Sequence, residues 1–297
     1  MTIFLAWLLD ALWGEPPARL HPVVWMGSYL RAAKKYNDGT IKRGVLLWAG
    51  GATLSVGSAA VAQMVLTRLP VLVQIPIAAV LLKPLFAWRA LKEAAQTVAD
   101  APDLPEARKQ LSWSLVSRDT SELSAGEVYG ATIESVAENL SDSVVAPLFY
   151  YCIGGLTLAG LYRYANTADA MWGYRTPELE RFGKMAARTD DVLNWIPARL
   201  TTLCLLGASA LAGKDTRRAF QVWRRDSHNT SSPNAGQPMS TMAGILGRQL
   251  TKRGVYSLGA EFDEPTRADV ERTLRVTNIA AWLVVAGATL WMLRRRL

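Results

Sequence analysis

The chain has 297 residues, of which 50% are hydrophobic, and it carries a net charge of +8. Its length would suit one or two soluble domains, but long apolar runs without charge are rare in such domains. Two cysteines and two histidines are too few for a disulfide framework or a zinc cluster. The cations flank apolar runs instead of forming one basic domain with stacking aromatics, so nucleic-acid binding is not expected.

The chain opens with a short apolar stretch, MTIFLAWLLDALWG. No Lys or Arg precedes its apolar core and no small-residue cleavage site follows it, so a removable signal peptide is not expected. The stretch is also short for a membrane crossing. We therefore predict a short first helix, with Asp10 held near the membrane interface.

Five later apolar runs predict further helices. Three of them contain no charged residue and are about as long as a hydrocarbon core is thick: residues 44–67, 143–162 and 276–293. Two more, residues 69–88 and 192–213, hold one cation each and several prolines, which neighbouring helices can accommodate. The sequence thus predicts an all-α polytopic membrane protein with about 4–6 membrane helices. A soluble helical bundle is the alternative, which the uncharged runs disfavour.

The distribution of cations conflicts with a topology in which every run crosses once. Positive flanks usually face the cytoplasm, but that topology puts the C-terminal arginines outside. A segment that does not cross would resolve the conflict, and residues 131–173 are the best candidate, because Gly154-Gly155 divides them into two halves with polar outer ends. These halves predict a re-entrant helical hairpin surrounded by protein or water. A single straight crossing is the alternative, and the chain around Pro197 and Arg199 is a second candidate for irregular structure.

We expect one membrane-embedded domain over residues 1–297, with function carried by its polar loops. The polar segment 214–275 contains RDSHNTSSPNAGQP, whose Ser, Asn, Gly and Pro residues predict a loop. Loops of such length on a rigid helical scaffold often carry function.

One acidic stripe begins the predicted hairpin. Glu134, Glu138 and Asp142 are four residues apart, so on an α-helix they lie on one face, with Asn139 beside them. A bound cation would relieve the repulsion between these carboxylates, and carboxylates suit Mg²⁺ that is shared with substrate phosphates. A solvated helix face is the alternative. The stripe adjoins an apolar run, however, and ionisable groups there usually serve a function.

A second group of polar residues follows the glycine pair. Asn166 and Asp169 are three residues apart, so they share a helix face that could look toward the acidic stripe. Asp190, Asp191 and Asn194 stand at the start of the next apolar run. The alternative for the two aspartates is an interaction with the N-terminal dipole of that helix.

Two motifs suit the binding of phosphate. SRDTSEL places Arg118 beside Asp119 and Thr120, and a guanidinium can hold phosphate bidentately. The alternative is that Thr120 or Ser121 caps the following helix. SPNAG, at residues 232–236, can present backbone N–H groups to an anionic oxygen, although such residues also make ordinary turns.

Six motifs, spread over nearly the whole chain, resemble the adenosylcobinamide-phosphate synthase (cobinamide synthase) family of cobalamin biosynthesis. In chain order they are LDALWGEPPARLHPVVWMG, SRDTSEL, ATIESVAENLSDSVVAPLFYY, YRYANTADAMWGYR, FGKMAARTDDVLNWIPARLT and RDSHNTSSPNAGQPMSTMAGIL. The resemblance implies a multi-pass inner-membrane enzyme with cytoplasmic active-site loops. Such an enzyme joins adenosylcobyric acid to (R)-1-aminopropan-2-ol or its O-phosphate, forming an amide with consumption of ATP in the presence of Mg²⁺.

The resemblance also suggests roles for residues at matching positions. The expected Mg²⁺ ligands are Glu134, Glu138, Asp142 and Asp169. The expected catalytic residues are these four together with Asp190 and Asp191, either of which could be the base for the attacking amine. The expected substrate- and nucleotide-binding residues are Arg118, Asp119, Thr120, Asn139, Asn166, Asn194, Arg199, Ser232, Asn234, Gly236 and His21. One departure is Thr230, where the family often has His, and His228 lies two residues earlier.

Two other classes of protein stay open. A related branch resembles a non-enzymatic membrane sensor involved in β-lactamase regulation, and intramembrane carboxylates can also line the path of a transporter. The complete acidic and SPNAG motifs favour the enzyme, and the lack of inverted repeats disfavours the transporter. As partners we expect the lipid bilayer, the corrinoid and amino alcohol substrates, and either a second copy or other membrane enzymes of cobalamin assembly.

Overall fold

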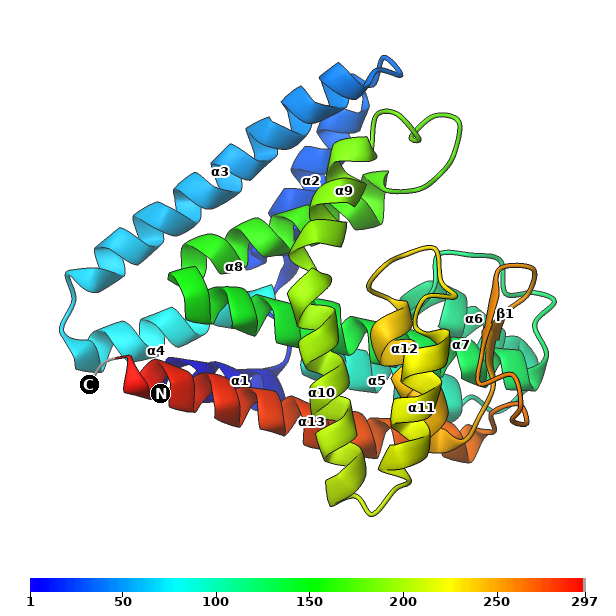
Figure 1. The fold of residues 1–297 in the computed structure, drawn as a ribbon. Coiled ribbons are helices and arrows are strands. Elements are labelled where there is room, and N and C mark those ends of the chain that lie inside the picture. Colours follow the sequence, from blue (N-terminus) through cyan, green and yellow to red (C-terminus); the bar gives the residue numbers. More distant parts are fainter. Residues whose placement is uncertain (296–297) are drawn as a thin grey trace. The chain divides into compact units, whose positions relative to one another are not determined.

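A computed structural model describes residues 1–295, which are mostly helical (Figure 1). The α-helices are α1 (Thr2–Trp13), α2 (Pro22–Lys34), α3 (Ile41–Thr67), α4 (Val71–Leu82), α5 (Trp88–Ala99), α6 (Leu104–Ser114), α7 (Ala125–Leu140), α8 (Ala146–Trp172), α9 (Lys184–Leu193), α10 (Trp195–Leu211), α11 (Thr216–Asp226), α12 (Gly236–Leu246) and α13 (Arg267–Arg294). Two strands, β1 (Leu250–Lys252) and β2 (Tyr256–Leu258), form an antiparallel hairpin. The all-α class is confirmed. Arg296, the last of the three C-terminal arginines, lies outside the described residues.

Four helical segments within residues 1–295 are long and apolar enough to cross a membrane. They are Ile41–Thr67, Val71–Ala99, Ala125–Trp172 and Arg267–Arg294, and two shorter apolar helices are α1 and α10. Large apolar side chains project from α3 into the surroundings, among them Leu46, Leu54 and Val61. Such exposure is typical of a surface that lipid or another helix covers. The polytopic membrane class is therefore confirmed.

The chain forms two compact units, each built from separate stretches of sequence. Unit 1 comprises Met1–Ala87, Ala146–Asn194 and the segment from Val285 onward, and unit 2 comprises Trp88–Val145 and Trp195–Val284. One domain over residues 1–297 stays a prediction. The two units alternate along the sequence, which is compatible with it.

The core of unit 1 lies where α3 packs against α8. Trp48, Tyr164, Trp172 and Phe182 are all buried there. Gly51 permits the close approach of the two helices, because a Cβ at this position would lie 2.2 Å from the Tyr164 hydroxyl oxygen. Tyr164 donates a hydrogen bond to the Trp48 carbonyl oxygen at 3.0 Å, so the aromatic core is also tied to the backbone.

The helix α8 folds back on itself at Gly154-Gly155 (Figure 1). Gly155 has φ 64° and ψ −150°, which is a conformation open to glycine. The rings of Tyr150 and Tyr162 stack with centroids 5.3 Å apart, whereas twelve residues of straight helix would separate them by about 18 Å. The predicted break is thus confirmed, and the alternative of one straight helix is wrong. That the hairpin is re-entrant in a membrane stays a prediction.

Unit 2 combines two helical groups with the β-hairpin. Val98, Leu111 and Val128 form a buried cluster among α5, α6 and α7. The start of α7 is fixed by a capping box in which Ser124 and Glu127 exchange side-chain and backbone hydrogen bonds. The expectation that Thr120 or Ser121 caps this helix is therefore wrong.

Two further expectations concern the regularity of the helices. The helix α10 runs without interruption from Trp195, and Pro197 lies in its first turn, where a missing N–H costs no intrahelical bond. The chain there is therefore regular. A π-helical turn, Ser141–Val145, separates α7 from α8. Pro147, which has no N–H to donate, follows this widened turn. Asp142 therefore lies in the π-helical turn, whereas Glu134 and Glu138 belong to α7.

Candidate functional site

Glu134 is the centre of a buried polar cluster in unit 2, which we call the Glu134 cluster. The residue is only 5% exposed, and one carboxylate oxygen, Oε1, has no hydrogen-bond partner among the described residues. Tyr256 donates a hydrogen bond to the carboxylate, and Arg118 and Lys252 supply positive charge nearby. A buried carboxylate is costly unless it is paired. The cluster thus offers one free oxygen beside two cations.

The β-hairpin contributes Tyr256 and Lys252, which the motifs did not indicate. These two residues pair across the hairpin, so their side chains project from the same face. Burial and the charges of Glu134 and Glu138 raise the pKa of Tyr256, which keeps its hydroxyl protonated as a donor. The signal that could have found the hairpin is Gly254, with φ 69°, between short runs with strand propensity.

The remaining polar residues of α7 lie one turn beyond Glu134. Glu138 is half-buried, and its charge acts on Glu134. Asn139 donates to the carbonyl and hydroxyl oxygens of Ser135 at 2.9 and 3.2 Å, and the Ser135 hydroxyl donates to the Leu115 carbonyl oxygen. The amide of Asn139 therefore forms hydrogen bonds within the helix. The sequence had predicted a substrate contact for this residue and not these bonds.

The segment SRDTSEL forms a turn that leaves Arg118 beside Glu134. Thr120 donates to the Arg108 carbonyl oxygen at 2.8 Å, and Asp119 accepts from the backbone N–H of Ser121 at 2.9 Å. The latter bonds hold the pKa of Asp119 below its ordinary value. Asp119 and Thr120 thus shape the turn, while Arg118 is the residue of this segment that contributes charge to the cluster.

A second polar cluster, which we call the Asp190 cluster, lies in unit 1. Asn166 of α8 and Asn194 donate to the two carboxylate oxygens of Asp190 at 3.2 and 3.0 Å. Tyr162 donates to the Asn194 side-chain oxygen at 2.9 Å. The hairpin makes this arrangement possible, because it turns the second half of α8 toward α9.

The surroundings of Asp190 raise its affinity for a proton above that of an exposed aspartate. Burial raises the pKa of this carboxyl above its ordinary value and the charge of Asp191 adds to the effect, whereas the bonds from Asn194 and Asn166 lower it. Burial also raises the pKa of Asp191, although the positive charge of Arg188 lowers it in part. Both aspartates lie near the C-terminal end of α9, and the first turn of α10, the helix of the next apolar run, contains no acidic residue.

The residues expected to bind Mg²⁺ are divided between the units. Glu134, Glu138 and Asp142 belong to unit 2, whereas Asp169 belongs to unit 1. Within residues 1–295, no group of three or more His, Cys, Asp or Glu side chains gathers as a metal site. Mg²⁺ commonly takes only one or two carboxylates and completes its shell with water and phosphate. Glu134 and Glu138 fit that need, and the set of four ligands stays a prediction.

His21 belongs to an ion-pair network at the start of unit 1. Its Nδ1 accepts the backbone N–H of Val23, so Nε2 carries the proton that is shared with Glu15 at 2.9 Å. Glu15 also pairs with Lys83 at 2.7 Å, and Lys83 pairs with the buried Asp10 at 3.1 Å. Asp10 is thus buried in an ion pair, its position near the membrane interface stays a prediction, and His21 caps α2.

The SPNAG loop uses some of its backbone donors internally. The Ser232 hydroxyl oxygen accepts from the N–H groups of Asn234 and Ala235 at 3.2 and 3.3 Å. Gly236 is required because a Cβ would lie 2.2 Å from the Ser227 carbonyl oxygen. Asn234 itself is buried. The predicted concavity for an anion is therefore filled in part by Ser232.

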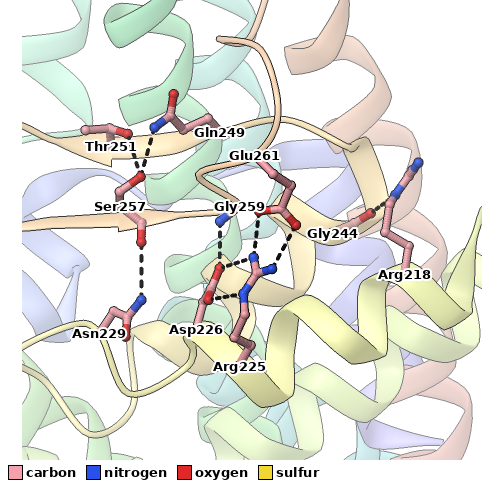
Figure 2. Close-up of polar contacts among 10 residues, drawn as sticks. All are labelled: Arg218, Arg225, Asp226, Asn229, Gly244, Gln249, Thr251, Ser257, Gly259 and Glu261. Carbon is pink, nitrogen blue, oxygen red and sulfur yellow. Dashed lines mark hydrogen bonds and ion pairs between the residues drawn. The ribbon is translucent and has the colours of Figure 1, made fainter.

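Figure 2 shows how the base of this loop is anchored to the β-hairpin. Asp226 forms a bidentate pair with Arg225 at 2.6 and 2.9 Å and accepts the backbone N–H of Gly259 at 2.7 Å. Burial would raise the pKa of Asp226, but these bonds hold it below its ordinary value. Asn229 donates to the Ser257 carbonyl oxygen, so loop and hairpin form one structural element.

Arg199 lies on α10 with its guanidinium 4.2 Å from the centroid of the exposed Trp195 ring. One of its N–H groups donates to the Trp195 carbonyl oxygen at 2.8 Å. No carboxylate pairs with it among the ion pairs of the described residues. Its charge is thus available to a ligand, as the prediction of a phosphate contact requires.

A family model for the CobD/Cbib protein matches residues 3–286 of the chain. The chain belongs to the CobD/Cbib family. A probable cobalamin biosynthesis protein CobD from Methanothermobacter thermautotrophicus is 39% identical over 97% of both chains. The cobalamin biosynthesis protein CobD of Geobacter metallireducens is 41% identical over 95% of this chain and 89% of its own. That of Yersinia enterocolitica is 36% identical over 93% and 89%. No solved structure matches the chain.

Proposed function

We propose that this CobD/Cbib family member acts in cobalamin biosynthesis as an ATP- and Mg²⁺-dependent amide ligase. Its substrates are adenosylcobyric acid and (R)-1-aminopropan-2-ol or its O-phosphate. The names of the relatives support the pathway, and the six motifs support the reaction. The enzyme sits in the inner membrane with its active-site loops toward the cytoplasm, as a homo-oligomer or with other membrane enzymes of cobalamin assembly.

One observation carries the proposal: the buried Glu134 lies beside Arg118 and Lys252, and one of its carboxylate oxygens has no hydrogen-bond partner in the described part of the chain. A buried carboxylate beside two cationic side chains suits a ligand that contains both a metal ion and phosphate. When bound there, Mg²⁺ would neutralise the phosphate charge of ATP, with Glu134 and Glu138 as its protein ligands. Arg118 and Lys252 would hold phosphate oxygens.

The reaction needs the carboxylate to be activated before the amine attacks. A carboxylate oxygen of the corrinoid attacks the γ-phosphorus of ATP, so that ADP leaves and an acyl phosphate forms. The amine nitrogen then attacks the acyl carbon, phosphate leaves, and the nitrogen loses a proton. Both steps concentrate negative charge on phosphate, so Arg118 stabilises them electrostatically.

Asp190 is suited to accept the proton of the amine. Its carboxylate is oriented by Asn166 and Asn194, and its raised pKa makes it a stronger base than an exposed aspartate. Asp191, with a pKa that is also raised, is the second candidate. Arg199 and the SPNAG loop would bind the anionic groups of the remaining substrate.

The test is ATP-dependent amide formation by purified protein, followed by mass spectrometry with each amino alcohol in turn. We expect Glu134→Gln, Glu138→Gln and Arg118→Ala to lose most of the rate. Glu122→Gln is the matched control, because it makes the same change on an exposed residue outside both clusters. Glu134→Gln and Glu122→Gln variants with equal rates would contradict the assigned site. No amide with either amino alcohol would contradict the ligase and favour the sensor.

A further inference from the structure

A cavity of about 290 Å³ lies in unit 1 at the tip of the α8 hairpin. Gln63 and Thr67 line it from α3, Gln74 from α4, Gly154-Gly155 from the tip, and Arg295 from the end of α13. Figure 1 draws the start of α1 and the end of α13 close together at this end of unit 1. None of the lining residues belongs to the Glu134 or Asp190 cluster, so the proposed reaction leaves this cavity without a role.

The charge of the cavity is positive. Of the described residues that line it, Arg295 alone is charged, and no carboxylate is among them. One Arg295 N–H donates to the Cys152 carbonyl oxygen at 3.0 Å, and the guanidinium lies 5.3 Å from the centroid of the Trp291 ring. A guanidinium has further N–H donors in a planar fork that matches phosphate oxygens. The cavity therefore suits an anion with oxygen acceptors.

Side-chain amides add neutral donors to the same cavity. The Gln63 carbonyl oxygen Oε1 accepts from the backbone N–H and hydroxyl of Thr157 at 3.3 and 3.4 Å. This fixes the carbonyl end of Gln63 on the hairpin and leaves its NH₂ group as the end that can donate to a ligand. Gln74, which is half-buried, lines the cavity from the opposite helix.

Exposed apolar residues neighbour the lining residues along the chain. Met64 follows Gln63 and is 56% exposed, Leu72 lies two residues before Gln74 and is 88% exposed, and Trp291 is 52% exposed. Exposed apolar side chains of this kind can pack against lipid acyl chains. Trp with Arg at the end of an apolar helix is typical of a membrane interface. The anion that fits this cavity is thus one attached to lipid.

We propose that the tip cavity binds the phosphate of an anionic phospholipid headgroup, with Arg295 as the charged contact. The acyl chains then cover the apolar surfaces of α3 and α4. Because the lipid contacts both Gln63 and the hairpin backbone, its binding stabilises the fold-back of α8.

Cys152 provides a direct measurement, because it lines the cavity and the other cysteine, Cys204, belongs to unit 2. In a Cys204→Ser background, the rate at which a methanethiosulfonate reagent modifies Cys152 reports occupancy. The detergent-purified protein is mixed with phosphatidylglycerol, with phosphatidylcholine or with inorganic phosphate. We expect phosphatidylglycerol at ten times its Kd to slow modification about tenfold, and the two other additions to have little effect.

Two variants and a control complete the test. Arg295→Gln should abolish protection and Gln74→Leu should weaken it. Arg294→Gln should retain it, because Arg294 is a neighbouring exposed arginine that does not line the cavity. Equal protection by phosphatidylcholine, or protection that survives Arg295→Gln, would overturn the proposal. Equal protection by inorganic phosphate would overturn the assignment to lipid. Amide ligase activity is not used in this assay, so its outcome is independent of the proposed reaction.

Discussion

Replacing Gly155 by alanine should destabilise unit 1 by about 2–4 kcal/mol. With φ 64° and ψ −150°, the backbone lies in a region that costs other residues about 1–3 kcal/mol. A Cβ would also lie 2.3 Å from the Gln63 side-chain oxygen, so Gln63 would have to move and release Thr157. Losing such a cap at the start of a helical segment costs about 1 kcal/mol more.

Thermal unfolding of the purified protein in one detergent measures this effect. A change of about 1 kcal/mol shifts Tm by about 2–4 °C in a large domain, so Tm should fall by about 4–16 °C. Gly57→Ala is the matched control, because Gly57 lies within α3 and a Cβ there meets nothing within 4 Å. Alanine in a helix interior stabilises by about 0.5–1 kcal/mol, so this variant should unfold no earlier than the wild type.

A Tm for Gly155→Ala equal to that of Gly57→Ala would refute the requirement for glycine at the hairpin tip. A double mutant separates the two causes. In a Gln63→Ala background the clash is absent, so Gly155→Ala should cost only the backbone part of the effect. If Gly155→Ala lowered the stability of the Gln63→Ala protein as much as that of the wild type, the clash with Gln63 would not contribute to the effect.

Three further changes test the clusters and the loop. Tyr256→Phe removes the donor to the buried Glu134 and should lower stability by about 1.5–3 kcal/mol in denaturant unfolding; unchanged stability would contradict the contact. Asn166→Leu removes a bond that lowers the pKa of Asp190, so that pKa should rise and the acid limb of the pH–rate profile should move to higher pH. An unmoved limb would argue against Asp190 as the base. The pKa of Asp226 is lowered, so its stabilisation is present at neutral pH and is lost as pH falls from about 4 through its folded value. The protection factors of residues 227–235 against hydrogen exchange should therefore fall in acid, and Asp226→Ala should show low protection already at neutral pH; wild-type protection in the variant would contradict the anchor.

The family comparison supports a role in cobalamin biosynthesis. The relatives that match nearly the whole chain are named for cobalamin biosynthesis. The proposed amide formation and the proposed lipid site are tested by separate assays.

The sequence by itself determined the class of the protein and its main backbone features. Uncharged runs of membrane length predict helices because hydrocarbon tolerates few other structures, and this depends on local composition alone. The glycine pair at 154 and 155 predicts a break because an unusual backbone conformation is also a local property.

Tertiary structure alone decided which side chains meet. Tyr256 and Lys252 come from a short hairpin and meet Glu134, far away in the sequence, so no spacing along one helix could have indicated them. Ser232 takes up two of the N–H groups that SPNAG was expected to offer, and Asp142 lies in a π-helical turn outside α7. Side-chain partners depend on how distant segments pack, and many packings are compatible with the same local preferences. For this reason the sequence indicated candidate residues such as Glu134 and Arg118, whereas their contacts depended on the packing of distant segments.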